Sequence, residues 1–164
     1  MILVCLDGTE GSWQALDEAM HQVQAHESWL LVNVIPDAAP SITGFFAAGL
    51  GVNPNAVLCS WAQYGEYTLE EGRRRIHTFF GSQTVVLMRL EEAHHCTVGK
   101  TLAQIIRDEQ PRLAVLGAHG EHPEVSNLGL TVHWVVQHEK SHTLIVHSNP
   151  SQTLFEPLVR GGTA

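Results

Sequence analysis

The chain has 164 residues, of which 44% are hydrophobic and 16% charged, which suits one globular domain with a substantial core and excludes an intrinsically disordered protein. Nine basic residues stand against 17 acidic ones, and the formal net charge of −8 argues against nucleic acid as the main partner. The N-terminal stretch lacks the pattern of a signal peptide, and no apolar run approaches the roughly 18 residues that span a membrane.

The first part of the chain predicts two buried strands with a helix between them. An apolar run at 2–6 ends at Asp7 and predicts a strand that is covered on both faces. Apolar residues three and four positions apart predict a helix after it, with Thr9 or Ser12 as the N-cap. The inward face of this helix comprises Trp13, Leu16, Met20 and Val23. A second apolar run at 29–35 predicts another buried strand, which the following proline ends.

A long segment without a clear period, 36–57, follows the second strand. It contains three prolines and three glycines, and its middle part is unusually apolar. Structureless segments of this length are uncommon in compact domains. We therefore expect a lid, a binding loop or an interface arm here.

A long helical pattern comes next, and two glycines lie on its apolar side. Gly65 and Gly72 weaken a helix but permit close packing against a sheet. The apolar side itself consists of Leu58, Ala62, Leu69, Ile76 and Phe80.

The rest of the chain alternates strands with helices. Apolar runs at 84–90, 113–117 and 143–147 predict three strands. One helix, which ends before Pro111, separates the first two, and another separates the last two. The inward residues of these helices are Val98, Leu102, Ile105, Ile106, Leu128, Val132, Val135 and Val136. Residues 149–164 form a C-terminal tail that we expect to dock on the domain or on a second subunit.

The alternation of strands and helices up to a fifth strand predicts an α/β fold. Its sheet is expected to be open, doubly wound and parallel, with right-handed crossovers and helices on both faces, in one domain over 1–148. Ligands of such sheets bind beyond the carboxyl ends of the strands, where the strand order reverses. If the first and fourth strands are adjacent there, Asp7 and Gly117 face the same crevice.

Three stretches of the chain are similar to the universal stress protein family. ILVCLDGTEGS (2–12) resembles the opening strand, acidic residue and first helix of that family. VGKTLAQIIRDEQPRLAVLGAHG (98–120) resembles its third helix, fourth strand and glycine loop, and GLTVHWVVQHEKSHTLIVHS (129–148) its last helix and closing strand. The resemblance covers about residues 1–148, apart from 36–57. It implies a five-stranded, Rossmann-like sheet in the order 3-2-1-4-5, assembled as a homodimer.

One branch of the family binds ATP or AMP through a glycine motif, and the other branch lacks both the motif and known nucleotide binding. The motif reads Gly, two residues, Gly, nine residues, Gly, then Ser or Thr. Gly117 and Gly120 match its first pair, but only eight residues precede Gly129, and Leu130 stands where the hydroxyl residue belongs. Thr131 carries a hydroxyl one position late, about 100° further round the helix. Two glutamates in the loop add negative charge.

The resemblance implies that Asp7 lies against the adenine and that Val34 lines the base pocket. Asp-Gly is also a common turn pair, so Asp7 fits equally well as the cap of a turn. Backbone N–H groups of a glycine loop at a helix N-terminus bind phosphate, whereas in a plain turn Gly117 and Gly120 take positive φ and nothing binds. His119 stands where family members often carry a histidine, and we interpret it as a loop former rather than a catalyst.

Other chemistry-bearing patterns find less support. The stretch 94–101 ends like a P-loop, but His94 stands where a P-loop needs glycine. The eleven histidines lack paired metal-ligand spacings, so we expect no metal, and a pH-responsive role remains an alternative from composition alone. No catalytic triad, nucleophile elbow or acid/base pair stands out, so we expect no enzyme activity beyond weak ATP hydrolysis. The odd, widely spaced Cys5, Cys59 and Cys96 favour a reducing compartment, and we expect the cytoplasm.

Two function hypotheses follow. The first is a cytoplasmic stress-response or signalling module that binds ATP or AMP between Asp7, the 117–120 loop and the 129–131 turn, where the first and fourth strands meet. The second is an interaction protein of the same fold with a degenerate, empty site, acting through its dimer and the apolar segment 36–57. In both, the last strand, 143–147, is an apolar sheet edge that a twofold partner pairs with. Neither hypothesis involves a membrane, and the identity of any further protein partner stays open.

Overall fold

The structure is a computed structural model of the whole chain. It describes residues 1–24, 26–37, 54–93, 96–118, 129–139 and 142–147. The expectations for His119, Gly120 and Leu128, for the tail 149–164 and for most of the segment 36–57 lie outside these residues.

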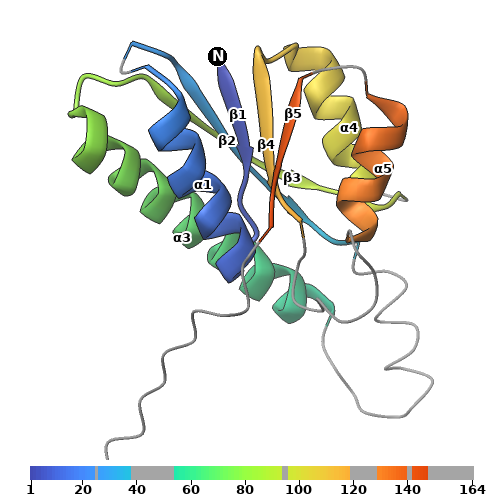
Figure 1. The fold of residues 1–164 in the computed structure, drawn as a ribbon. Coiled ribbons are helices and arrows are strands. Elements are labelled where there is room, and N and C mark those ends of the chain that lie inside the picture. Colours follow the sequence, from blue (N-terminus) through green and yellow to red (C-terminus); the bar gives the residue numbers. More distant parts are fainter. Residues whose placement is uncertain (25, 38–53, 94–95, 119–128, 140–141, 148–164) are drawn as a thin grey trace, which may run out of the picture.

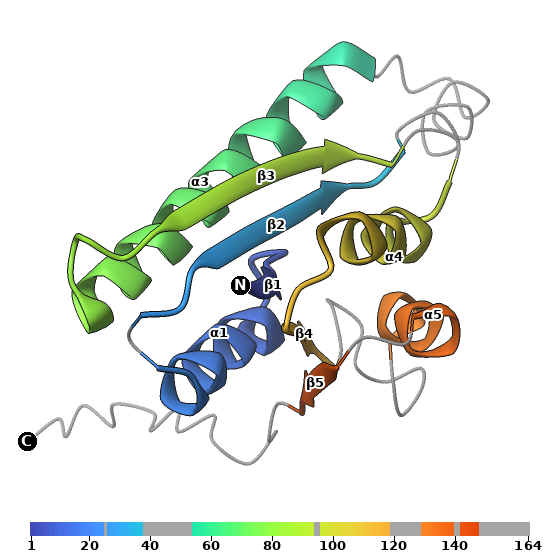
Figure 2. The same ribbon diagram turned by 90° about the horizontal axis from the view of Figure 1, so that it is seen from above.

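Five parallel strands form one sheet in the order β3-β2-β1-β4-β5, which confirms the predicted topology (Figure 1). The strands are β1 (Ile2–Cys5), β2 (Trp29–Ile35), β3 (Val86–Glu92), β4 (Leu113–Gly117) and β5 (Thr143–Val146). The helices are α1 (Glu10–Gln22), α3 (Pro54–Phe80), α4 (Val98–Glu109) and α5 (Leu130–His138). Helices α1 and α3 cover one face of the sheet, and α4 and α5 cover the other, as Figure 2 shows.

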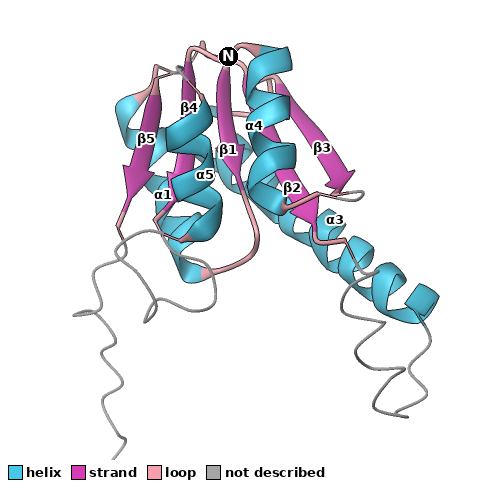
Figure 3. Ribbon diagram, turned by 90° about the vertical axis from the view of Figure 1, so that its right-hand side faces the viewer, coloured by secondary structure: helices cyan, strands magenta, loops and turns pink. Residues whose placement is uncertain are grey.

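The structure locates the starts of α1 and α3. Thr9, not Ser12, is the N-cap of α1, and its side chain accepts a hydrogen bond from the Ser12 backbone N–H. The Ser12 hydroxyl donates in return to the Thr9 carbonyl oxygen at 2.9 Å. Helix α3 begins at Pro54, inside the segment expected to lack structure, and proline is tolerated in the first turn of a helix. Its first turns extend beyond the carboxyl ends of the strands (Figure 3).

Two further predictions need correction. Strand β3 begins at Val86 rather than at residue 84, because Thr84 closes a turn in which its N–H donates to the Gly81 carbonyl oxygen at 3.2 Å. Val136 was expected to face inward and is 48% exposed. The core is reached by Val132 and Val135 instead, and the next residue is turned about 100° away from Val135.

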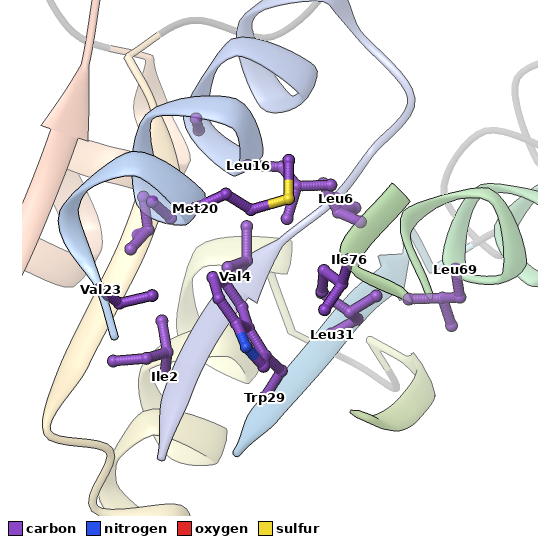
Figure 4. Close-up of a cluster of buried hydrophobic side chains, with 13 residues drawn as sticks. Ile2, Val4, Leu6, Leu16, Met20, Val23, Trp29, Leu31, Leu69 and Ile76 are labelled. Carbon is purple, nitrogen blue, oxygen red and sulfur yellow. The ribbon is translucent and has the colours of Figure 1, made fainter. Parts of the chain in front are cut away.

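Alternate residues of the strands supply two cores, one on each face of the sheet. Figure 4 shows the core beneath α1 and α3, where Leu16 and Met20 lie over Val4. Its buried members also include Ile2, Leu6, Trp29, Leu31, Leu69, Ile76 and Val115. The core beneath α4 and α5 includes Leu3, Leu30, Val32, Leu102, Ile105, Ile106, Leu116 and Val135.

Helix α3 approaches the sheet closely through its two glycines, as predicted. A Cβ atom added at Gly72 would lie 2.6 Å from Leu6 Cδ1 and 2.9 Å from Leu31 Cδ1. One added at Gly65 would lie 2.6 Å from Leu90 Cδ1. Within the described part of the chain, no helix is both long and apolar enough to cross a membrane.

Candidate functional site

A cavity of about 360 Å³ lies beyond the carboxyl ends of β1 and β2. The strand order reverses beside it, between β1 and β4, because α1 follows β1 on one face of the sheet and α4 leads into β4 on the other. Gly117, at the end of β4, is not among the described residues that line the cavity. The cavity is lined by Asp7, Thr9, Asn33, Val34, Ile35, Pro36, Trp61, Tyr64, Val98 and Thr131. A second hollow lies on the outer surface of α3 and is lined by that helix alone, between Tyr67 and Thr78.

Asp7 follows β1 and has a structural role in the turn that leads into α1. Its Oδ1 atom accepts hydrogen bonds from the Thr9 backbone N–H at 2.9 Å and from the Thr9 hydroxyl at 2.6 Å. Gly8 between them has a φ of +83°, which favours glycine. The same Asp7 carboxylate borders the cavity. The turn interpretation therefore describes what Asp7 does in the fold, and contact with a ligand stays a prediction.

Strand β2 supplies the apolar wall of the cavity and one buried amide. Val34, which the resemblance assigned to the base pocket, lines the cavity and is 8% exposed. Asn33 was missed because it stands inside an otherwise apolar run. Its side chain is 7% exposed, and its Nδ2 atom donates to the Leu6 carbonyl oxygen at 2.6 Å. This bond ties the end of β2 to the residue directly before Asp7.

Two aromatic residues of α3 close one side of the cavity, and the sequence reading missed both. Trp61 and Tyr64 lie about one turn apart in the first half of α3, and both line the cavity. The Tyr64 ring lies over Gly8, because a Cβ atom added at Gly8 would be 2.7 Å from Tyr64 Cζ. The Tyr64 hydroxyl reaches the Gly8 carbonyl oxygen at 3.5 Å. The only sequence signal was a pair of aromatic residues three positions apart, beside the apolar face of the helix.

Gly117 ends β4 and packs against the backbone of α1. A Cβ atom added there would lie 2.7 Å from both the carbonyl carbon and the oxygen of Gly11, and 3.0 Å from the Ser12 nitrogen. Gly117 is absent from the residues with positive φ in the described chain, so the positive φ that the plain-turn alternative expected for it is wrong. Whether this glycine contacts a ligand stays a prediction. Gly120 and His119, which follow it, lie outside the described residues.

The start of α5 brings Thr131, rather than Leu130, to the cavity. Gly129 is the N-cap, and its N–H donates to the Ala118 carbonyl oxygen at 2.8 Å. Leu130 is 87% exposed, whereas Thr131 lines the cavity. The hydroxyl that stands one position late in the motif is therefore the one that borders the candidate site. Gly129 has no side chain with which to cap the first turn of α5.

Neither a nucleophile nor a metal cluster accompanies the cavity in the described residues. Burial raises the pKa of the Cys5 thiol to about 12, and the nearby Asp7 carboxylate adds to this rise, so the thiol stays protonated and is a poor nucleophile. No group of three His, Cys, Asp or Glu side chains in this part of the chain is arranged to hold a metal ion. His94 and His95 lie outside it.

No family model matches the chain, and no curated protein matches it. Solved structures do match. The universal stress protein UspA from Lactobacillus plantarum superposes with a TM-score of 0.71 at 19% identity, over 88% of this chain and 95% of that one. A universal stress protein family protein from Arabidopsis thaliana with AMP bound gives 0.60 at 13% identity, over 95% and 96%. A universal stress protein in complex with cAMP gives 0.59 at 17% identity, over 90% and 96%. The chain therefore has the fold of the universal stress proteins.

Proposed function

We propose that this chain is a universal stress-type protein that binds an adenine nucleotide in the cavity beyond β1 and β2. The observation that carries the proposal is that residues distant in sequence line the same cavity. Asp7 and Val34, which the resemblance assigned to the base, and Thr131, the hydroxyl one position late in the glycine motif, come from three different parts of the chain and line one cavity. Two proteins with this fold were crystallised with AMP and with cAMP, which supports the same ligand class.

The cavity offers suitable chemistry for each part of such a ligand. The Asp7 carboxylate accepts hydrogen bonds and so suits the exocyclic amine of adenine. Val34 provides an apolar surface for the base. The Thr131 hydroxyl and the backbone N–H groups of the first turn of α5, whose N-cap Gly129 has no side chain, suit a phosphate, because the positive end of the helix dipole lies there.

The nucleotide would act as a signal rather than as the substrate of a fast reaction. The described residues at the cavity include no positioned base paired with a nucleophile, and the Cys5 thiol is protonated. We infer a stress-response or signalling module of the cytoplasm whose ligand biases contacts with a second subunit or another protein.

Replacing Asp7 with alanine separates its two roles. If the carboxylate contacts the base, we expect Asp7→Ala to weaken AMP binding by tenfold or more, on the order expected for a hydrogen bond to a charged group. If Asp7 only caps the turn, the melting temperature falls and the Kd for AMP is unchanged. Calorimetric titration with AMP measures the Kd.

Asp17→Ala is the matched control, because it removes the same charge from an exposed position on α1. Protein purified without added ligand should also be extracted and inspected for bound adenine nucleotide. Absence of heat with both AMP and ATP at millimolar concentration, together with no extracted adenine, would mean that the site is empty and that the interaction-protein hypothesis holds.

We also infer a homodimer that pairs through the outer edge of β5. Ala114 N–H donates to the His142 carbonyl oxygen and Ala118 N–H to that of Val146, so even-numbered residues of β5 bond to β4. The alternation along a strand directs the Ile145 N–H to the outer edge. No other strand of the described chain pairs with that edge.

Sedimentation velocity tests the dimer, which we expect at twice the chain mass of 18.0 kDa. Ile145→Pro removes the N–H group that points to the outer edge and leaves the hydrogen bonds between β5 and β4 in place. We therefore expect this variant to be a monomer. Ile145→Ala keeps the N–H and should stay dimeric. A monomeric parent protein, or a dimeric proline variant with native circular dichroism, rules out pairing through this edge.

A further inference from the structure

The lining of the cavity is poor in positive charge. Among the described residues that line it, Asp7 carries the one carboxyl group, and there is no lysine or arginine. Two segments outside the described residues adjoin it in sequence, 38–53 after β2 and 119–128 after β4. Neither contains a lysine or arginine, and the second contains two glutamates. The described lining and these two segments therefore supply no lysine or arginine to a phosphate group, and Lys100, two residues after Val98, is exposed and does not line the cavity.

Backbone donors offset this lack only in part. The Gly129 N–H already donates to the Ala118 carbonyl oxygen, so it is committed within the protein. The N-terminus of α5 carries the equivalent of about half a positive charge. That suits one phosphate group beside Thr131. Each further phosphate would add negative charge at this end, where the described lining has no lysine or arginine to neutralise it.

The aromatic and apolar residues of the lining suit a flat, apolar ligand group. Trp61 and Tyr64 contribute two aromatic side chains from consecutive turns of α3, and Val34 adds an apolar wall. The Tyr64 ring rests on Gly8, next to the carboxylate that would meet an exocyclic amine. Stacking of a base on an aromatic side chain is worth on the order of a tenfold to hundredfold gain in affinity.

We propose that the cavity is a nucleoside site, in which the base and ribose supply most of the affinity and Trp61 and Tyr64 hold the base. The site then binds adenosine and AMP at least as tightly as ATP. This inference rests on the proposed function, and it assigns the ligand preference and two residues that determine it. By mass action, such a site fills when nucleoside and monophosphate accumulate.

Calorimetric titrations with adenosine, AMP and ATP at one ionic strength test the preference. We expect adenosine and AMP to bind with similar Kd values and ATP to bind no more tightly than AMP, with or without Mg²⁺. Affinity for adenosine should also be insensitive to salt, since it involves no phosphate. ATP binding tenfold or more tightly than adenosine overturns the inference and leaves the proposed function intact. Absence of binding by all three overturns both.

Substitutions in α3 test the aromatic residues. Trp61→Leu and Tyr64→Leu should each weaken adenosine binding about tenfold or more, whereas Trp61→Phe should retain most of it. Tyr67→Leu is the matched control, because Tyr67 is 67% exposed on the same helix and lies outside the cavity. Unchanged adenosine affinity in Trp61→Leu and Tyr64→Leu, with native melting temperatures, overturns the assignment of these residues.

Discussion

Gly117→Ala is expected to lower the free energy of unfolding by about 3 kcal/mol, at the upper end of the range for an overpacked site. The added methyl group would lie 2.7 Å from the carbonyl carbon and oxygen of Gly11. These are backbone atoms of the first turn of α1, and no side-chain rotation relieves the contact. Gly117 does not have positive φ, so alanine can adopt its backbone conformation without strain. The loss of stability then comes from the close contact alone.

Gly72→Ala is the informative control for this prediction. Its added methyl group would also approach neighbours closely, at 2.6 Å from Leu6 Cδ1 and 2.9 Å from Leu31 Cδ1. Those atoms end rotatable leucine side chains and can shift. Alanine also gains about 1 kcal/mol over glycine in the interior of a helix. We therefore expect a net change within about 1 kcal/mol for this variant.

Urea unfolding followed by circular dichroism measures both variants. A small effect of Gly117→Ala, equal to that of Gly72→Ala, would mean that α1 moves away from β4 at little cost. In that case Gly117 would be kept free of a side chain for a reason other than packing, and its assignment to a phosphate contact would regain support. A large effect shows that this motif glycine has a structural role that is independent of any ligand.

The sequence predicted most of the fold because its strands are short apolar runs with clear boundaries. The predicted bounds of β2 and β4 agree with the structure at both ends. Pro36 ends the apolar run of β2, and the apolar run of β4 begins and ends sharply at 113 and 117. The start of β3 was misplaced because Thr84 and Val85 continue the apolar, β-branched pattern into a turn. Periodicity reports which side chains are apolar, but it does not report where the hydrogen-bonded ladder begins.

The candidate site was predicted in outline and not in its lining. Asp7 and Thr131 could be anticipated because parallel topology brings the carboxyl ends of the inner strands and the starts of the following helices together. Trp61 and Tyr64 could not, because they border the cavity only if α3 starts well beyond the end of the sheet. The length of a helix relative to the strand that it covers depends on tertiary packing and leaves no periodic signal.

Asn33→Asp is expected to lower the free energy of unfolding by about 2 to 4 kcal/mol at pH 7. Asn33 is 7% exposed, and its Nδ2 atom donates to the Leu6 carbonyl oxygen at 2.6 Å. An ionised carboxylate cannot donate, so two oxygen atoms would face each other in a buried position. A protonated carboxyl group retains an O–H donor and restores the bond.

This substitution therefore carries a specific pH dependence. Burial and the carbonyl oxygen raise the pKa of the introduced carboxyl in the folded state above its value in the unfolded chain, which is about 3.9. The folded state then binds the proton more tightly, so the deficit relative to the parent protein is largest above the folded-state pKa. It shrinks as the pH falls and becomes constant below the pKa of the unfolded chain. Urea unfolding at a series of pH values between 7.5 and about 4 measures the difference.

Asn33→Ala serves as the comparison, because it removes the donor without adding an ionisable group. Its deficit relative to the parent should not change with pH. A deficit of Asn33→Asp that is equally independent of pH would contradict the role given to the bond with Leu6. If the dependence is found, the bond holds β2 to the residue before Asp7 and keeps the Asp7 turn in register with Val34. Adenosine affinity of Asn33→Asp should then be lower at pH 7 than that of the parent, because one wall of the cavity is displaced from the other.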